Sequence, residues 1–228
     1  YGLTKQVSTI SNALVILGIE AVKTLVLGFS LVNSLQESDL RGRSQMDYWR
    51  RSLYAGAAAN LLCRRMNVPE SEEVFLAALL QDMGIQTLIQ VVGDLYREIL
   101  SRHSVWGGSL VRMEKRVLGI DHCEAGRMLA GQWNLPPILG ESIRWHHHPR
   151  MAEAAYRQFC HIVKLSGMCS EIFMKHEEPA RIVRRVRDYA AAVFNVDHQT
   201  VDGLLAEAGE NTKELAELLD VNIGEMIS

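Results

Sequence analysis

Apolar residues recur with the period of an α-helix along almost the whole chain, and no other feature constrains the fold as strongly. Ile10, Leu14 and Leu17, for example, are separated by four and three residues and therefore share one helix face. The segment VFLAALLQDMG, residues 74–84, is apolar on nearly all sides, and a helix of this kind lies in the middle of a fold. The pattern predicts an all-α protein built around this central segment.

Turn and capping residues divide the pattern into separate helices. Ser71 is suited to cap the central helix, and Asp121 and Glu124 have the spacing of a capping box. Polar residues at 36–45 predict a loop. The predicted helices cover approximately residues 10–17, 22–32, 47–66, 71–84, 85–92, 94–101, 109–118, 121–133, 137–145, 151–175, 180–194 and 198–219.

Composition excludes several classes of protein. Aromatic residues make up 7% of the chain, which argues against an all-β sandwich, and the net charge of −3 gives no general attraction for nucleic acid or anionic membranes. The basic run at 181–187 is interpreted as a solvated helix face, and the helix pair around Gly18 as core rather than a DNA-binding motif. The longest apolar run, residues 74–80, is too short to span a membrane. We expect neither a nucleic-acid partner nor a membrane partner.

A length of 228 residues predicts one compact domain with a small appendage. The sequence Glu177-Glu178-Pro179 sets off the final segment, so we assign residues 1–176 to the main domain and residues 177–228 to a helical C-terminal extension packed on it. The four cysteines stand far apart without a CxxC pair, which is typical of reduced thiols and predicts a cytoplasmic protein.

Four polar residues are of the types from which helical bundles build metal sites. They are Asp82 in the central segment, His122 at a helix start, and His146 and His147 at a helix end. Periodicity does not show whether they converge, since Asp82 could simply end its helix and His122 could face solvent. The three consecutive histidines at 146–148 cannot share one helix face, so at least one of them is expected in solvent.

Several stretches, in this order, resemble the HDOD family, the HD-related output domains of bacterial signalling proteins. They are YGLTKQVSTISNALVILGIEAVKTLVLGFS, YWRRSLYAGAAANLL, EEVFLAALLQDMGIQTL and MEKRVLGIDHCEAGRMLAGQWNLPPILGESIRWHHHP. The resemblance extends from about Tyr1 to Gly167. It implies a compact HD-like helical bundle whose opening helices lie upstream of Tyr1.

HDOD domains are similar to the HD and HD-GYP phosphohydrolases, whose metal ligands include an early His, a His-Asp pair, later histidines and a final Asp. By this resemblance, the ligand positions correspond to Arg51, Gln81, Asp82, His122, His146, His147 and Gly167. Arg51 is permanently positive, Gln81 offers only a neutral amide, and Gly167 has no side chain. A catalytic site must hold its ion and keep a position open for water. We therefore expect no catalytic residue and no cofactor, and any residual metal would be bound by Asp82, His122, His146 and His147.

Two residues are expected to support this degenerate site. Arg51 is predicted to pair with Asp82 where the metal would have been, because a guanidinium can satisfy a carboxylate with two hydrogen bonds. Glu114 could anchor a histidine or a backbone amide, or it could be a solvated surface carboxylate.

The resemblance implies a non-catalytic signalling or regulatory module that acts through protein contacts. Family members are often joined to receiver domains or to GGDEF domains that make cyclic di-GMP, so such a domain is the expected partner. The alternative is a divergent metal-dependent phosphohydrolase or phosphodiesterase of the HD type. A nucleotide attracted by the histidines and Arg51 is a further hypothesis, for which the sequence gives no independent support.

Overall fold

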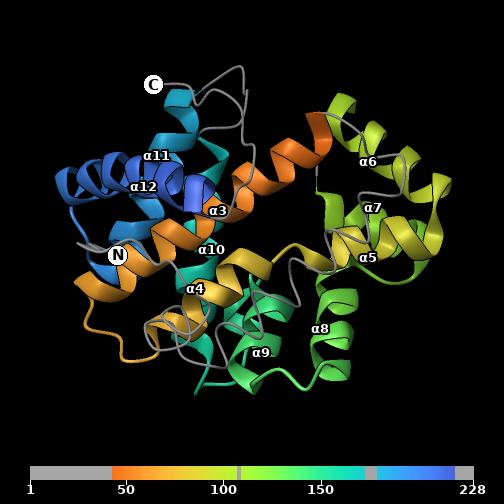
Figure 1. Ribbon diagram of the computed structural model, residues 1–228, viewed down its shortest axis with the longest axis horizontal. Helices are drawn as coiled ribbons and strands as arrows, with labels where there is room; N and C mark the ends of the chain where they lie inside the picture. Colours follow the sequence, from red (N-terminus) through yellow and green to blue (C-terminus); the bar gives the residue numbers. More distant parts are fainter. Residues whose placement is uncertain (1–42, 107–108, 173–178, 219–228) are drawn as a thin grey trace.

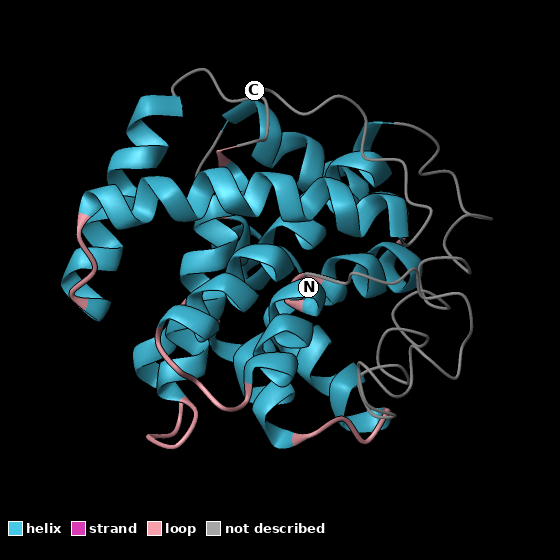
Figure 2. Cartoon of the chain, turned by 60° about the vertical axis from the view of Figure 1, so that its left-hand side comes forward, coloured by secondary structure: helices cyan, strands magenta, loops and turns pink. Residues whose placement is uncertain are grey.

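The computed structural model describes residues 43–106, 109–172 and 179–218, and every regular element in these ranges is a helix (Figures 1 and 2). The elements are α3 (Arg43–Arg65), α4 (Ser71–Leu80), α5 (Met83–Val92), α6 (Asp94–Trp106), α7 (Leu110–Leu118), α8 (His122–Gln132), α9 (Pro137–Trp145), the 3-10 helix η1 (Pro149–Met151), α10 (Arg157–Glu171), α11 (Pro179–Phe194) and α12 (His198–Leu218). The predicted helices at 10–17 and 22–32 lie outside the described residues. The all-α prediction is confirmed over the described part of the chain.

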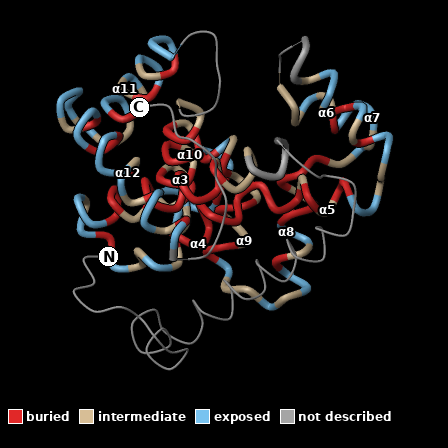
Figure 3. The backbone as a smooth tube through the Cα atoms, turned by 45° about the horizontal axis from the view of Figure 1, so that its top comes forward, coloured by how far each residue is buried: buried red, intermediate tan, exposed pale blue. Residues whose placement is uncertain are grey.

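The long helix α3 forms the centre of the main core. Its buried face includes Ala55, Ala58 and Ala59, whose small side chains let neighbouring helices approach closely. Helices α4, α10 and α12 pack around it (Figure 1). Figure 3 shows that the buried segments concentrate where α3, α4, α9 and α10 meet. One apolar cluster runs through this region and continues into the C-terminal helices.

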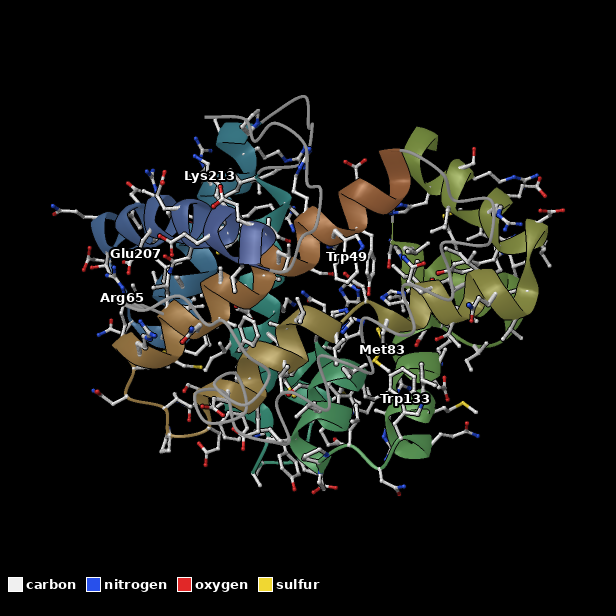
Figure 4. The ribbon with its side chains drawn as sticks, viewed as in Figure 1. Trp49, Arg65, Met83, Trp133, Glu207 and Lys213 are labelled. Atoms are coloured by element: carbon white, nitrogen blue, oxygen red, sulfur yellow. The ribbon has the colours of Figure 1, made fainter. Side chains whose placement is uncertain are left out.

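The described part of the C-terminal extension packs on this core. Apolar residues of α11 and α12 belong to the same buried cluster as those of α3. The Tyr54 hydroxyl of α3 donates a buried hydrogen bond of 2.6 Å to the Leu205 carbonyl of α12. At the surface, Arg65 and Glu207 form an ion pair of 3.1 Å between the same two helices (Figure 4). Helix α12 therefore covers α3 rather than forming a core of its own.

A smaller lobe comprises α5 to α8. Its apolar cluster includes Leu88, Tyr96 and Ile99. Helix α5 crosses α8 so closely that a Cβ atom added at Gly84 would lie 1.8 Å from the His122 carbonyl oxygen. Glycine is required at this crossing, and the crossing brings the start of α5 against the start of α8.

The central apolar segment consists of two helices, so the prediction of one helix through residues 74–84 is wrong. Helix α4 ends at Leu80, and α5 begins after a turn at Gln81 and Asp82. The Gln81 amide donates to the Ala78 carbonyl at 3.0 Å, and side-chain bonds of this kind compete with the regular helix ladder. By length and composition Ser71–Val92 could cross a membrane, but most of it is buried inside the fold.

Three other boundaries differ from the predictions. Ser71 is the first helical residue rather than the cap, and the capping position, Glu70, makes no side-chain cap hydrogen bond. The helix predicted at 151–175 is split, because Ala152 is extended and its carbonyl accepts a 3.1 Å hydrogen bond from Arg157. Helix α3 already begins at Arg43, within the predicted loop. The remaining helices predicted within the described ranges are confirmed, apart from shifted ends.

Candidate functional site

The four polar residues singled out in the sequence converge between the main core and the smaller lobe. Asp82 Oδ1 lies 3.7 Å from His122 Nε2 and 3.6 Å from His146 Nε2. His122 Nε2 in turn lies 3.2 Å from His147 Nε2. Asp82, His122 and His146 are buried, so the interpretation of His122 as a solvent-facing residue is wrong.

Helix ends deliver these side chains. Asp82 precedes α5, and the neighbouring Met83 marks this place in Figure 4. His122 opens α8 after Asp121, whose carboxylate accepts the Glu124 backbone N–H at 2.8 Å. This confirms the first half of the predicted capping box. The Glu124 carboxylate instead accepts a hydrogen bond from the Lys115 ammonium at 2.9 Å.

The run of three histidines ends α9. His146 follows the last helical residue, His147 is partly buried and His148 is exposed. The prediction that at least one of the three is solvated is confirmed. The His146 Nδ1–H donates to the Ile143 carbonyl at 2.8 Å, which turns Nε2 of the same ring toward Asp82.

Glu114 of α7 anchors His122 from the opposite side. Its Oε2 accepts hydrogen bonds from His122 Nδ1 at 2.7 Å and from the His122 backbone N–H at 3.1 Å. Its Oε1 accepts a 2.5 Å hydrogen bond from the Tyr96 hydroxyl. Burial, reinforced by Glu114, raises the pKa of Tyr96, so the phenol remains a donor. Glu114 is completely buried, so the surface interpretation is wrong, and the anchoring of both a histidine and a backbone amide is confirmed.

Arg51 of α3 pairs with Asp82, as predicted. Its Nε lies 3.1 Å from Asp82 Oδ2, with the side chain 30% exposed. The pair lacks the predicted two hydrogen bonds, because the buried Nε is not aligned for one. Burial opposes ionisation of Asp82, but Arg51 and the neighbouring His146 hold its pKa well below the usual range. Asp82 is therefore a carboxylate whose charge is already compensated.

The positions of Gln81 and Gly167 lie side by side. Gln81 is 1% exposed, and a Cβ atom added at Gly167 on α10 would lie 2.7 Å from its Oε1 atom. An aspartate at 167 would not fit beside the present glutamine. These two positions, which the resemblance aligned with a His and an Asp ligand of the HD phosphohydrolases, are complementary in packing here.

Cys123 was missed by the sequence interpretation. One ligand atom from each of His122, Cys123, His146 and His147 lies within 4.8 Å of the others. Burial would raise the pKa of the Cys123 thiol, but His146 and His122 lower it to about 7. The one sequence signal is its place next to His122 at a helix start. The four cysteines were interpreted as reduced thiols, because they stand far apart without a CxxC pair.

Charge is unevenly shared among the three imidazoles. Burial disfavours protonation of His122 and His146. Cys123 and Glu114 nevertheless raise the pKa of His122 to about 10, and Cys123 and Asp82 raise that of His146 to about 9. Burial and the positive charge of these two rings strongly lower the pKa of His147. His147 is thus a neutral imidazole, able to act as an acceptor or a ligand.

The hydrolytic metal of the HD relatives does not fit this donor set. Asp82 is paired with a guanidinium, Gln81 offers no strong ligand and Gly167 offers none. A water-activating metal needs firm ligands together with an open coordination position. No hydrolytic step follows from the arrangement, which leaves three imidazoles and one thiol as a cluster of nitrogen and sulfur donors.

Solved structures share this architecture. The chain is similar to a suspected phosphohydrolase from Shewanella amazonensis, with 24% identity and a TM-score of 0.71 over 94% of this chain and 78% of the other. It is similar to an HDOD domain protein of unknown function from Geobacter sulfurreducens, with 18% identity and a TM-score of 0.73 over 96% and 77%. The MmoQ response regulator from Methylococcus capsulatus has 20% identity and a TM-score of 0.63 over 90% and 78%. At these identities the similarity establishes the fold alone.

Sequence comparison gives the family. No curated protein matches the chain at a significant level. The HDOD domain family matches residues 1–149, more than half of the sequence. The chain therefore belongs to the HDOD domain family.

Proposed function

We propose that this HDOD domain is a non-catalytic regulatory module of bacterial signal transduction that acts through protein contacts in the cytoplasm. The ion pair between Arg51 and Asp82 carries the proposal. A hydrolytic metal would need the Asp82 carboxylate, which Arg51 already neutralises. Because an unpaired buried charge is strongly destabilising, exchanging this partner for a loosely held metal ion is unfavourable.

The other altered ligand positions support the same conclusion. Gln81 hydrogen-bonds to the helix backbone and packs against Gly167, so both positions contribute to packing of α10 against the turn between α4 and α5. Neither can hold a metal ion for catalysis. A domain with these replacements keeps the HD-like fold. We expect its outer surface, rather than the former metal pocket of such folds, to contact the partner protein.

The proposed partner is a receiver domain or a GGDEF domain, linked to this domain or encoded separately, within cyclic di-GMP signalling. The fold similarity to a protein named a response regulator supports the receiver class. Calorimetric titration with the receiver and GGDEF proteins of the same genome tests this step. Saturable binding to one of them is expected, and absence of heat with all of them would contradict the choice of partner.

A phosphohydrolase is the second candidate function. It is favoured by the convergence of His122, His146 and Asp82, and by fold similarity to the Shewanella protein. The test is turnover of cyclic dinucleotides and of bis(p-nitrophenyl) phosphate with Mg²⁺, Mn²⁺ or Fe²⁺. The matched control is Asp82→Asn, which keeps the shape of the side chain and removes its charge.

The regulatory proposal expects no metal-dependent turnover above that of Asp82→Asn. Turnover that Asp82→Asn abolishes would overturn it in favour of the phosphohydrolase. Circular dichroism on both proteins shows whether the comparison is between folded domains.

A further inference from the structure

The ring orientations of His122 and His146 direct both Nε2 atoms at the same small volume. His122 Nδ1 faces the Glu114 carboxylate and His146 Nδ1 faces the Ile143 carbonyl, and both of these oxygens only accept. In a neutral ring, Nε2 then carries the lone pair. A carboxylate or carbonyl bound to the other ring nitrogen is also the usual support of a metal-binding histidine.

Asp82 is close to both Nε2 atoms but beyond hydrogen-bond distance, because Asp82 Oδ1 lies 3.7 Å from His122 Nε2 and 3.6 Å from His146 Nε2. His146 Nε2 is buried in a residue 2% exposed and makes no hydrogen bond. His122 Nε2 faces His147 Nε2 at 3.2 Å, so without a metal the protonated His122 donates to the neutral His147. A metal ion bound by both rings takes the place of this proton.

The buried charges are compatible with this exchange. Asp82 and Glu114 are two buried carboxylates, and Arg51 compensates only one of them at the cluster. With Cys123 as a thiolate, the metal-free cluster is neutral when His122 and His146 each carry a proton. A divalent cation that replaces these two protons keeps the cluster neutral.

We propose that His122, Cys123, His146 and His147 form a closed binding site for one thiophilic divalent cation of the zinc class. Four ligands of the N/S type are the donor set of a structural zinc site, whereas hydrolytic metals need oxygen ligands or an open position. On binding, the protons on His122 and His146, and the thiol proton where Cys123 still carries one, leave to solvent. The site differs in its ligands and in its chemistry from the hydrolytic centre of the HD phosphohydrolases.

The distances require a small adjustment. Ligand atoms bound to zinc at about 2.0–2.3 Å lie roughly 3.3–3.8 Å from one another in a tetrahedron. The His122–His147 pair at 3.2 Å already meets this spacing, while the whole set spans 4.8 Å. The most distant ligand atoms therefore have to approach by about 1 Å on binding. Among the four residues only His147 is partly exposed, so we expect an ion to enter from its side.

Cobalt titration of metal-free protein tests the site. After chelator treatment and removal of the chelator, we expect one Co²⁺ per chain, with a near-ultraviolet thiolate-to-cobalt absorption band that one equivalent of Zn²⁺ abolishes. Cys123→Ser should lose this band and weaken Zn²⁺ binding by at least about 100-fold. The matched control is Cys160→Ser, because Cys160 is also buried but does not belong to the cluster, and its thiol donates to the Glu141 carbonyl at 3.5 Å.

His147→Gln provides a second variant, at a partly exposed position where misfolding is not expected. It should keep the helical circular dichroism and lose the affinity. No cobalt binding, or a band that survives Cys123→Ser, would overturn the proposal. Phosphodiester turnover would contradict the proposed function instead, so the two failures are distinguishable.

Discussion

The main core around α3 differs from the polar junction between this core and the smaller lobe in how its residues depend on one another. The junction comprises Asp82, Tyr96, Glu114, His122 and His146. In the core, side chains such as Leu53 and Ala58 make many contacts without directional requirements. At the junction, Tyr96, Glu114 and His122 each have a defined partner and almost no exposed surface. Changing a core residue removes apolar contacts, whereas changing a junction residue also leaves a buried polar group without its partner.

The largest expected effect is that of Gly84→Ala, which acts on the crossing that assembles the junction. The new Cβ would lie 1.8 Å from the His122 carbonyl oxygen, so α8 has to move away from α5. We expect a loss of about 4 kcal/mol or more in the free energy of unfolding, measured by urea denaturation. The control is Gly140→Ala in α9, where nothing lies within 4 Å and a stabilisation of about 0.5–1 kcal/mol is expected. Equal effects of the two substitutions would contradict the close crossing.

Removing Glu114 tests the mutual dependence at the junction. Glu114→Ala leaves three donors from Tyr96 and His122 without an acceptor, and we expect a loss of about 3–4 kcal/mol. Tyr96→Phe should cost clearly less in the Glu114→Ala background than in the native protein, since its acceptor is already absent. A double-mutant cycle measures this coupling, which we expect to reach about 1–2 kcal/mol.

The reference cycle pairs Glu114→Ala with Val186→Ala, a core residue of α11 in the main cluster. These two changes share no partner and should be additive within about 0.5 kcal/mol. Coupling of the same size in both cycles would remove the distinction between junction and core.

The contact between Gly167 and Gln81 combines features of the two regions, because it is a steric fit that involves a buried polar side chain. Gly167→Ala places a Cβ 2.7 Å from Gln81 Oε1, and we expect a loss of about 1–2 kcal/mol. Gln81→Ala removes the obstructing atoms, so Gly167→Ala should cost much less in that background. Thermal unfolding of the four proteins checks the rescue, and an undiminished cost would show that the clash lies elsewhere.

The helices of the main core could be predicted from the sequence, whereas much of the junction could not, and the reason is physical. Helical period and alanine spacing report which residues face an apolar interior, and this is how α3 was placed. The break at Gln81 and Asp82 gave no such signal, because apolar residues surround it on all sides. At the break the Gln81 side chain donates a hydrogen bond to the Ala78 carbonyl, and periodicity does not register a bond of this kind.

The candidate site was predicted through resemblance rather than through pattern. Asp82 and His122 lie far apart in sequence, and the close crossing of α5 and α8 at Gly84 helps to bring them together. Resemblance also directed attention to positions where the relatives have ligands. Cys123, which has no counterpart among those ligands, was therefore overlooked despite its place beside His122.

The smallest expected effect is at Asp197, whose side-chain hydrogen bonds are as directional as those of the junction but are exposed to solvent. Its carboxylate accepts hydrogen bonds from the Thr200 backbone N–H and hydroxyl, both at 2.8 Å, ahead of α12. The backbone bond and then the hydroxyl bond lower the pKa of Asp197, so its stabilising contribution is present above the ordinary aspartate value and is lost as the pH falls below about 4. Asp197→Ala should lower Tm by only roughly 1–3 °C at neutral pH, with the difference from the native protein vanishing in acid.

Glu214→Ala, at an exposed carboxylate within α12, is the control for loss of charge alone. If Asp197→Ala destabilised the protein as much as Glu114→Ala, the loss of directional hydrogen bonds alone would explain why the junction is sensitive to substitution. A small effect of Asp197→Ala would instead assign this sensitivity to the burial of the junction's polar groups.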